Sequence, residues 1–180
     1  MKNTKFWNDA AIYGAYVGIA EVAFGALGTW KPSTLISLLS LVVFIALVHI
    51  FTRRRVALYG GGDEGYSYGK CLKFIVAMSM FAGVLVGAYS IVASNFLFAE
   101  HYHELVNTTI GTLAKSGLYT DDMLEQLKVV YDKFFFSPIY VVIVNIISYI
   151  IKGAFFGLFI AAFTRREATM FSSDMGDDKE

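Results

Sequence analysis

The sequence has a single cysteine, Cys71, and only two prolines among its 180 residues. One cysteine cannot form an internal disulfide, so cysteine usage does not indicate a redox compartment. Charged residues make up 17% of the chain and the formal net charge is zero, so bulk charge gives no sign of nucleic-acid binding. The chain also lacks a GxSxG nucleophile motif, and the glycines of YGGGDEG (59–65) lack the spacing and the lysine of a phosphate-binding loop. We expect no nucleic-acid partner and no cofactor.

Apolar residues dominate the chain instead. Hydrophobic residues make up 56% of it and the mean hydropathy is +0.55, which is too apolar for an ordinary soluble domain. Four apolar segments are long enough to cross a membrane as helices, although the second is near the lower limit. They cover residues 10–29, 35–51, 72–98 and 138–163. The sequence predicts an all-α polytopic membrane protein with one four-helix transmembrane domain (1–171) and a disordered acidic tail (172–180).

The first apolar segment carries small residues along one face. At steps of three and four residues, this face holds Ala11, Gly14, Gly18, Glu21, Gly25 and Gly28. Small residues let helix backbones approach closely in lipid, so we expect other helices to cover this face. A signal peptide is an alternative, because Lys2 and Lys5 precede the segment and Ala26-Leu27-Gly28 resembles a cleavage site. The length of the segment, the interrupting Glu21 and the glycine face favour a retained helix.

Two further spans repeat this pattern, and short connections predict hairpins. Close-packing pairs are expected at Gly83 and Gly87 in the third span, and at Gly153 and Gly157 in the fourth. The connection Lys31-Pro32-Ser33 is so short that the first two helices must form an antiparallel hairpin, with Pro32 or Ser33 starting the second helix. The second span is expected to end abruptly at Arg53-Arg54-Arg55. Ser137 and Pro138 supply an N-cap and a first-turn proline for the last span.

An acidic insert over residues 99–136 separates the third and fourth spans. Thr120 is expected to cap a helix with an apolar side at Leu124, Leu127, Tyr131 and Phe134, and Gly117 to end the helix before it. We expect a small helical hairpin lying on the membrane surface.

Basic residues predict the orientation in the membrane. If the amino terminus is cytoplasmic, ten basic residues lie inside and four lie outside: Lys2, Lys5, Arg53, Arg54, Arg55, Lys70, Lys73, Arg165, Arg166 and Lys179 against Lys31, Lys115, Lys128 and Lys133. The positive-inside rule then places both termini in the cytoplasm and the acidic insert outside. The second and fourth spans both end in Phe-Thr-Arg-Arg, at residues 51–54 and 163–166, which suggests that the two hairpins are a parallel repeat.

A carboxylate and an amine lie inside the predicted spans. Glu21 lies about 12 Å from the outer end of its helix and Lys152 about 17 Å from the inner end of its own, which places them at similar depth. Because side chains lean toward the amino terminus of their helix and these helices are antiparallel, the two would converge. We predict a buried ion pair beside three further polar residues of the last span, namely Asn145, Ser148 and Tyr149.

Two alternatives to this pair remain open. Lys152 can extend along its helix to a polar surface, and Glu21 can be protonated because burial disfavours its charged form. A real pair can fix helix register or mark the path of a proton, ion or substrate.

The three histidines give a weak indication of a metal site. Glu100-His101-Tyr102-His103-Glu104 contains possible zinc or copper ligands, but His101 and His103 point some 200° apart on a helix. A solvated helix end is the simpler interpretation. His49 has no ligand partner nearby in the sequence, and no metal is predicted.

Four stretches resemble an uncharacterised family of small inner-membrane proteins from Bacteroidota, known as domain of unknown function 4199. They are FWNDAAIYGAYVGI (6–19), GDEGYSYGKCLKF (62–74), the acidic helical insert, and the Ser137-Pro138 start of the last span. The resemblance implies an inner-membrane protein with four helices and no established activity, and it transfers no functional residues.

We expect a multi-pass protein of the bacterial inner membrane that is not an enzyme. Its predicted role is that of an accessory or scaffolding subunit, whose partners are the lipid bilayer and another membrane protein or a second copy of the chain. The alternative is a small carrier or flippase-like protein that moves a lipid-linked sugar or an ion past Glu21 and Lys152. A weaker alternative is a metal-dependent membrane enzyme that uses His101 and His103.

Overall fold

The computed structural model describes residues 2–60 and 65–166, and the predicted acidic tail lies outside them. The described residues are helical throughout, apart from short connections and one antiparallel bridge between Tyr66 and Arg166. The helices are α1 (Lys2–Trp30), α2 (Thr34–Tyr59), α3 (Tyr68–Val92), the π-helix η1 (Ala93–Leu97), α4 (Ala99–Lys115), α5 (Asp121–Phe136) and α6 (Pro138–Thr164).

Four helical segments are long and apolar enough to cross a membrane. They are Thr4–Trp30, Thr34–Tyr59, Tyr68–Leu97 and Pro138–Thr164. The prediction of an all-helical chain with four long apolar segments is therefore confirmed. Helix α2 continues through the three arginines to Tyr59, beyond the predicted end of the second apolar span. Arginine is a good helix former, and the helix stops only where the Gly60 amide donates back to the Val56 carbonyl at 2.7 Å.

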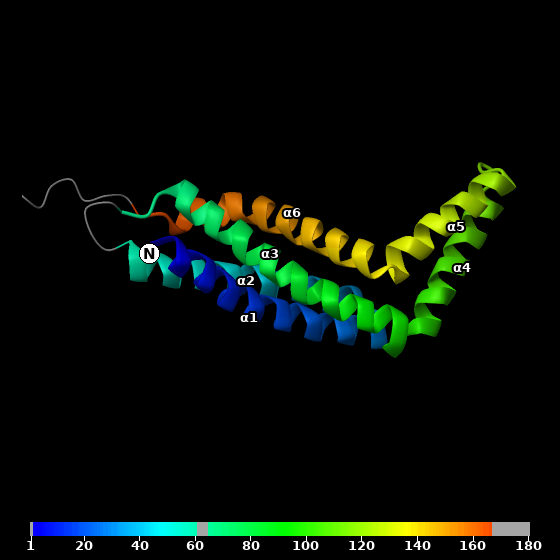
Figure 1. Ribbon diagram of the computed structural model, residues 1–180, viewed down its shortest axis with the longest axis horizontal. Coiled ribbons are helices and arrows are strands. Elements are labelled where there is room, and N and C mark those ends of the chain that lie inside the picture. Colours follow the sequence, from blue (N-terminus) through cyan, green and yellow to red (C-terminus); the bar gives the residue numbers. More distant parts are fainter. Residues whose placement is uncertain (1, 61–64, 167–180) are drawn as a thin grey trace, which may run out of the picture.

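The four long helices lie side by side, with α3 packed against both α1 and α6 (Figure 1). Helices α1 and α3 run in one direction along the bundle, and α2 and α6 run in the other. α2 packs against α1, α3 and α6. The core between the helices contains fully buried Val17 of α1, Phe44 and Val48 of α2, and Phe74 and Met78 of α3.

Glycines set the close approach of α3 to its two neighbours. A Cβ added at Gly14 would lie 2.5 Å from the Met78 carbonyl, and one at Gly83 would lie 2.9 Å from the Ile146 Cα. Added Cβ atoms at Gly18, Gly87 and Gly157 would each come within 3.0 Å of a neighbouring helix. Gly153 faces Ser79, and a Cβ there would lie 2.5 Å from the Ser79 Cβ.

Two of the glycines expected at helix contacts lie in looser surroundings. A Cβ at Gly25 would first meet Tyr89 at 3.5 Å, and one at Gly28 would first meet Ile36 at 3.9 Å. These are ordinary contact distances. The glycine face of α1 therefore packs tightly against α3 only over its first half.

The chain changes direction between α3 and α4. The last turn of the third long segment is the π-helix η1, which the sequence analysis did not predict, and Phe98 follows it. Helices α4 and α5 contact each other and lie beyond the end of the bundle (Figure 1).

The caps around α5 follow the local sequence signals only in part. Gly117, at φ +66°, lies two residues after the end of α4. The Thr120 hydroxyl accepts a hydrogen bond from the Met123 amide at 3.4 Å and caps α5. Pro138 is the first residue of α6, whereas the Ser33 and Ser137 side chains make no capping hydrogen bond.

Candidate functional site

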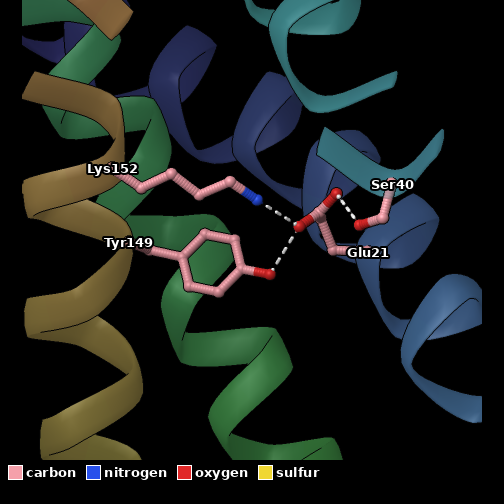
Figure 2. Close-up of polar contacts among 4 residues, drawn as sticks. All are labelled: Glu21, Ser40, Tyr149 and Lys152. Atoms are coloured by element: carbon pink, nitrogen blue, oxygen red, sulfur yellow. Dashed lines mark hydrogen bonds and ion pairs between the residues drawn. The ribbon is translucent and has the colours of Figure 1, made fainter. Parts of the chain in front are cut away.

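The Glu21 carboxylate lies inside the bundle and is bound by side chains from two other helices (Figure 2). The Lys152 ammonium donates to Oε2 at 2.7 Å, and the Tyr149 hydroxyl donates to the same oxygen at 2.7 Å. The Ser40 hydroxyl donates to Oε1 at 3.0 Å. The Glu21 side chain is only 3% exposed. One carboxylate on α1 therefore links α2 and α6, and both of its oxygens have donors.

Lys152 and Tyr149 reach Glu21 because of their place on α6. Residues three apart share a helix face, and side chains of antiparallel helices lean toward each other along the axis. The Lys152 ammonium also lies 4.0 Å from the centre of the buried Phe44 ring. An aromatic face attracts a cation, so Phe44 replaces part of the hydration that the ammonium loses.

The glycine contacts of α3 hold the Tyr149 end of this site. A Cβ at Gly83 would lie 3.0 Å from the Tyr149 Cβ, so an alanine here would push α6 away from α3. Gly153, next to Lys152 in the chain, makes the equivalent close contact with Ser79. The packing contacts and the polar site are therefore parts of one arrangement.

Ser40 was missed by the sequence analysis. It lies on α2, the most apolar of the four candidate spans, where one hydroxyl has little influence on the pattern. The sequence nevertheless indicates that Ser40 lies at a similar depth in the bundle to Glu21. Ser40 and Glu21 lie within about 14 Å of the helix ends that the short connection joins.

Asn145 and Ser148, which were predicted to lie beside the pair, are not among the described residues that donate a hydrogen bond to the Glu21 carboxylate. Both line a cavity of about 230 Å³ between α3, α5 and α6. The Asn145 amide donates to the Val141 carbonyl of its own helix at 2.8 Å. Of the predicted polar stripe on α6, Tyr149 and Lys152 therefore bind the Glu21 carboxylate.

A second ion pair, between a buried guanidinium and a half-buried carboxylate, lies near the N-terminal end of α1. The Arg55 guanidinium pairs with Asp9 and donates through Nε to the Tyr66 hydroxyl at 2.9 Å. Three rings surround the guanidinium carbon, with centres 5.2 Å (Phe6), 4.6 Å (Tyr59) and 4.7 Å (Phe74) away. Burial raises the pKa of the Tyr66 hydroxyl, and the neighbouring Arg55 opposes this shift.

From the sequence, Arg55 was expected only to set the orientation together with Arg53 and Arg54. Its burial to 5% exposure shows a structural role that Arg53 and Arg54, which are exposed, do not share. The missed signal is Asp9, an acidic residue at the start of the first apolar segment. In an antiparallel pair of helices, Asp9 lies at the level of the end of α2.

A family model described as Protein of unknown function (DUF4199) matches residues 11–166. The chain belongs to this family. The DUF4199 match includes Glu21, Ser40, Tyr149 and Lys152, whereas Asp9 of the second ion pair lies before it. No curated protein and no solved structure matches the chain.

Two histidines of this DUF4199 chain, His101 and His103, contact aromatic rings. The His103 ring stacks on Phe136 with centres 4.1 Å apart, and the His101 ring meets the edge of Tyr102 at 5.8 Å. In the described parts of the chain, no three His, Cys, Asp or Glu side chains are grouped so that they could hold a metal ion. His49 lines a cavity at the other end of the bundle, near the ends of α2 and α6.

Proposed function

We propose that this DUF4199 protein is a non-enzymatic accessory or scaffolding subunit of the bacterial inner membrane. The four long apolar helices span the bilayer as two hairpins, α1 with α2 and α3 with α6. Both termini are cytoplasmic and the α4–α5 pair is extracytoplasmic. The excess of basic residues on the side of the termini supports this orientation.

The full set of partners at Glu21 is the observation that carries this proposal. A carboxylate that relays a proton or binds a transported ion needs access to water at some stage. Glu21 is only 5% exposed, and a lysine, a tyrosine and a serine from two helices occupy its two oxygens. Such an arrangement fixes the relative positions of three helices. The membrane domain then serves as a rigid support.

The α4–α5 pair supplies the surface that this support presents. No residue of α5 is buried, and four of its apolar side chains are 45% to 60% exposed: Met123, Val129, Val130 and Phe134. Exposed apolar side chains in one region of an otherwise polar surface mark an interaction site. We therefore place the contact with a partner on α5.

Crosslinking in intact membranes followed by mild purification tests the proposal. A Val130→Asp variant should lose a defined crosslinked partner protein. The charge-matched Thr108→Asp variant, at an exposed position of α4, should retain it. If the wild-type chain yields no defined partner, or if both variants keep the same partner, α5 is not the contact and the scaffold proposal fails.

The partial exposure of Lys152 favours one second candidate, a small carrier or flippase-like protein for a lipid-linked sugar or an ion. The Lys152 side chain is 24% exposed, and Asn145 and Ser148 of the same helix line a cavity together with Ser90 and Ser94. A Glu21→Cys variant in a Cys71→Ser background decides between the candidates. Reaction with a membrane-impermeant thiol reagent supports the carrier, and complete protection supports the scaffold.

A further inference from the structure

Basic side chains gather around a cavity of about 360 Å³ where α2 and α6 end. The cavity is lined by His49 and Arg53 of α2, by Arg165 and Arg166 after α6, and by apolar residues that include Val56 and Phe163. Among the described residues, no Asp or Glu lines it. We infer that this cavity binds the phosphate group of an anionic ligand, for which the headgroup of an anionic lipid is the nearest source.

The helical geometry of α2 separates this cavity from the buried ion pair. His49, Arg53 and Val56 lie at i, i+4 and i+7, which places them on one face of the helix. Arg55 follows Arg53 by two residues and points some 200° away, where it pairs with Asp9. Consecutive arginines therefore serve different sites, and Arg54 lines neither of them.

The end of α6 is held in place opposite this face. The Tyr66 amide donates to the Arg166 carbonyl at 2.8 Å, and the Arg166 amide donates to the Tyr66 carbonyl at 3.0 Å. This bridge ties the chain after α6 to the segment before α3. It fixes the backbone from which the Arg166 side chain extends, so the basic wall from α6 is positioned before a ligand arrives.

The arginines on the two sides of the cavity come from the two Phe-Thr-Arg-Arg segments of the sequence. In each, the threonine hydroxyl donates to the carbonyl four residues earlier, from Thr52 to Val48 at 2.7 Å and from Thr164 to Ile160 at 2.8 Å. Each threonine is buried, and the arginine that follows it lines the cavity. The repeated motif therefore places an arginine of α2 and an arginine that follows α6 at the same cavity.

The position of the cavity along the helices indicates a phosphate ligand. Arg53 lies six residues before the end of α2 at Tyr59, and Arg165 and Arg166 follow the end of α6 at Thr164. Long basic side chains near the ends of apolar helices extend toward lipid headgroups. Guanidinium groups bind phosphate oxygens through paired hydrogen bonds. Phe163, which also lines the cavity, is 84% exposed and gives an acyl chain an apolar surface beside the charged groups. This inference is independent of the scaffold role and of which side of the membrane the cavity faces.

Lipid titration of the detergent-purified protein, read by native mass spectrometry, tests the inference. Phosphatidylglycerol should bind, and neutral phosphatidylcholine should bind much more weakly. Arg53→Gln and Arg166→Gln should each weaken phosphatidylglycerol binding about fivefold. Arg54→Gln removes the same charge from an exposed residue outside the cavity, and it should change binding by less than about twofold.

A second arm identifies the source of the phosphate. Inorganic phosphate is titrated into the lipid-depleted protein by calorimetry, with the same three variants. Binding that depends on Arg53 and Arg166 supports the inference in either arm, and the arm that shows it identifies lipid or free phosphate. The inference is overturned if neither ligand binds, if Arg54→Gln weakens binding as much as Arg53→Gln, or if both lipids bind equally and free phosphate does not bind. An Arg53→Lys variant that regains binding excludes misfolding as the cause of a loss.

Discussion

Lys152 and Glu21 form an ion pair at 2.7 Å, but their side chains are buried to very different extents, with 24% and 3% exposed. The partly exposed Lys152 ammonium can turn toward a polar surface if its partner is lost. The buried Glu21 carboxylate cannot reach solvent without a change in helix packing. Each partner should therefore have a different effect when it is lost.

We expect Lys152→Met to destabilise the protein more than Glu21→Gln does. Removing the lysine leaves a buried carboxylate with only two hydroxyl donors, at a cost of about 3 to 5 kcal/mol. The neutral amide of Glu21→Gln can keep a hydrogen bond, so this variant should lose about 1 to 3 kcal/mol of its free energy of unfolding. The double variant should lose less than Lys152→Met alone. Thermal unfolding in one detergent measures all three, and strictly additive losses would show that the pair is not coupled.

Loss of Arg55 should destabilise the end of the bundle where α1 begins and α2 ends. Arg55→Met leaves the Asp9 carboxylate unpaired in a half-buried position, so we expect a loss of about 3 kcal/mol. Arg54→Gln, one position away and exposed, is the matched control and should change the stability by less than about 0.5 kcal/mol. Unfolding followed by hydrogen exchange should show the change first in α1 and at the end of α2. If the two variants changed the stability equally, the ion pair with Asp9 would not contribute to the stability of the fold.

Gly153→Ala should separate α3 from α6. The new Cβ would lie 2.5 Å from the Ser79 Cβ, and overpacking of this kind costs about 1 to 3 kcal/mol. Ser79→Gly in the same chain should restore part of the loss. Gly28→Ala is the control, because its Cβ would first meet Ile36 at 3.9 Å and alanine favours the helix. A larger loss for Gly28→Ala than for Gly153→Ala would contradict the packing described here.

The Tyr66 hydroxyl should make the stability of the fold depend on pH in the alkaline range. Its pKa in the folded protein is raised above the ordinary value of 10.0, mainly by burial. The folded state then holds the proton more tightly than the unfolded state, so this contribution is complete below pH 10 and falls as the pH rises above it. Tyr66→Phe should remove that part of the dependence. The test compares the melting temperatures of the two proteins across this range, and parallel curves would contradict it.

Several features of the site could be predicted because they depend on depth and helix direction alone. Glu21 and Lys152 meet as their heights in two antiparallel helices suggest, and Tyr149 follows from its place one turn before Lys152. Ser40, Asn145 and Ser148 depend on which neighbour each turn of a helix faces. Sequence spacing gives the face of a helix but not the helix that covers it, so Ser40 was missed and the hydrogen-bond partner of Asn145 was not predicted.

By itself, the sequence determined that the chain forms four long apolar helices, since length and hydropathy are enough to specify such segments. It also marked the small residues along which helices can approach. Only the tertiary structure decided how the three arginines are used, because residues two apart point to opposite sides of a helix and the neighbours there differ. Arg55 became half of a buried pair with Asp9, while Arg53 came to face the end of α6 across a basic cavity. These contacts join residues that are far apart in the chain, and no local pattern specifies them.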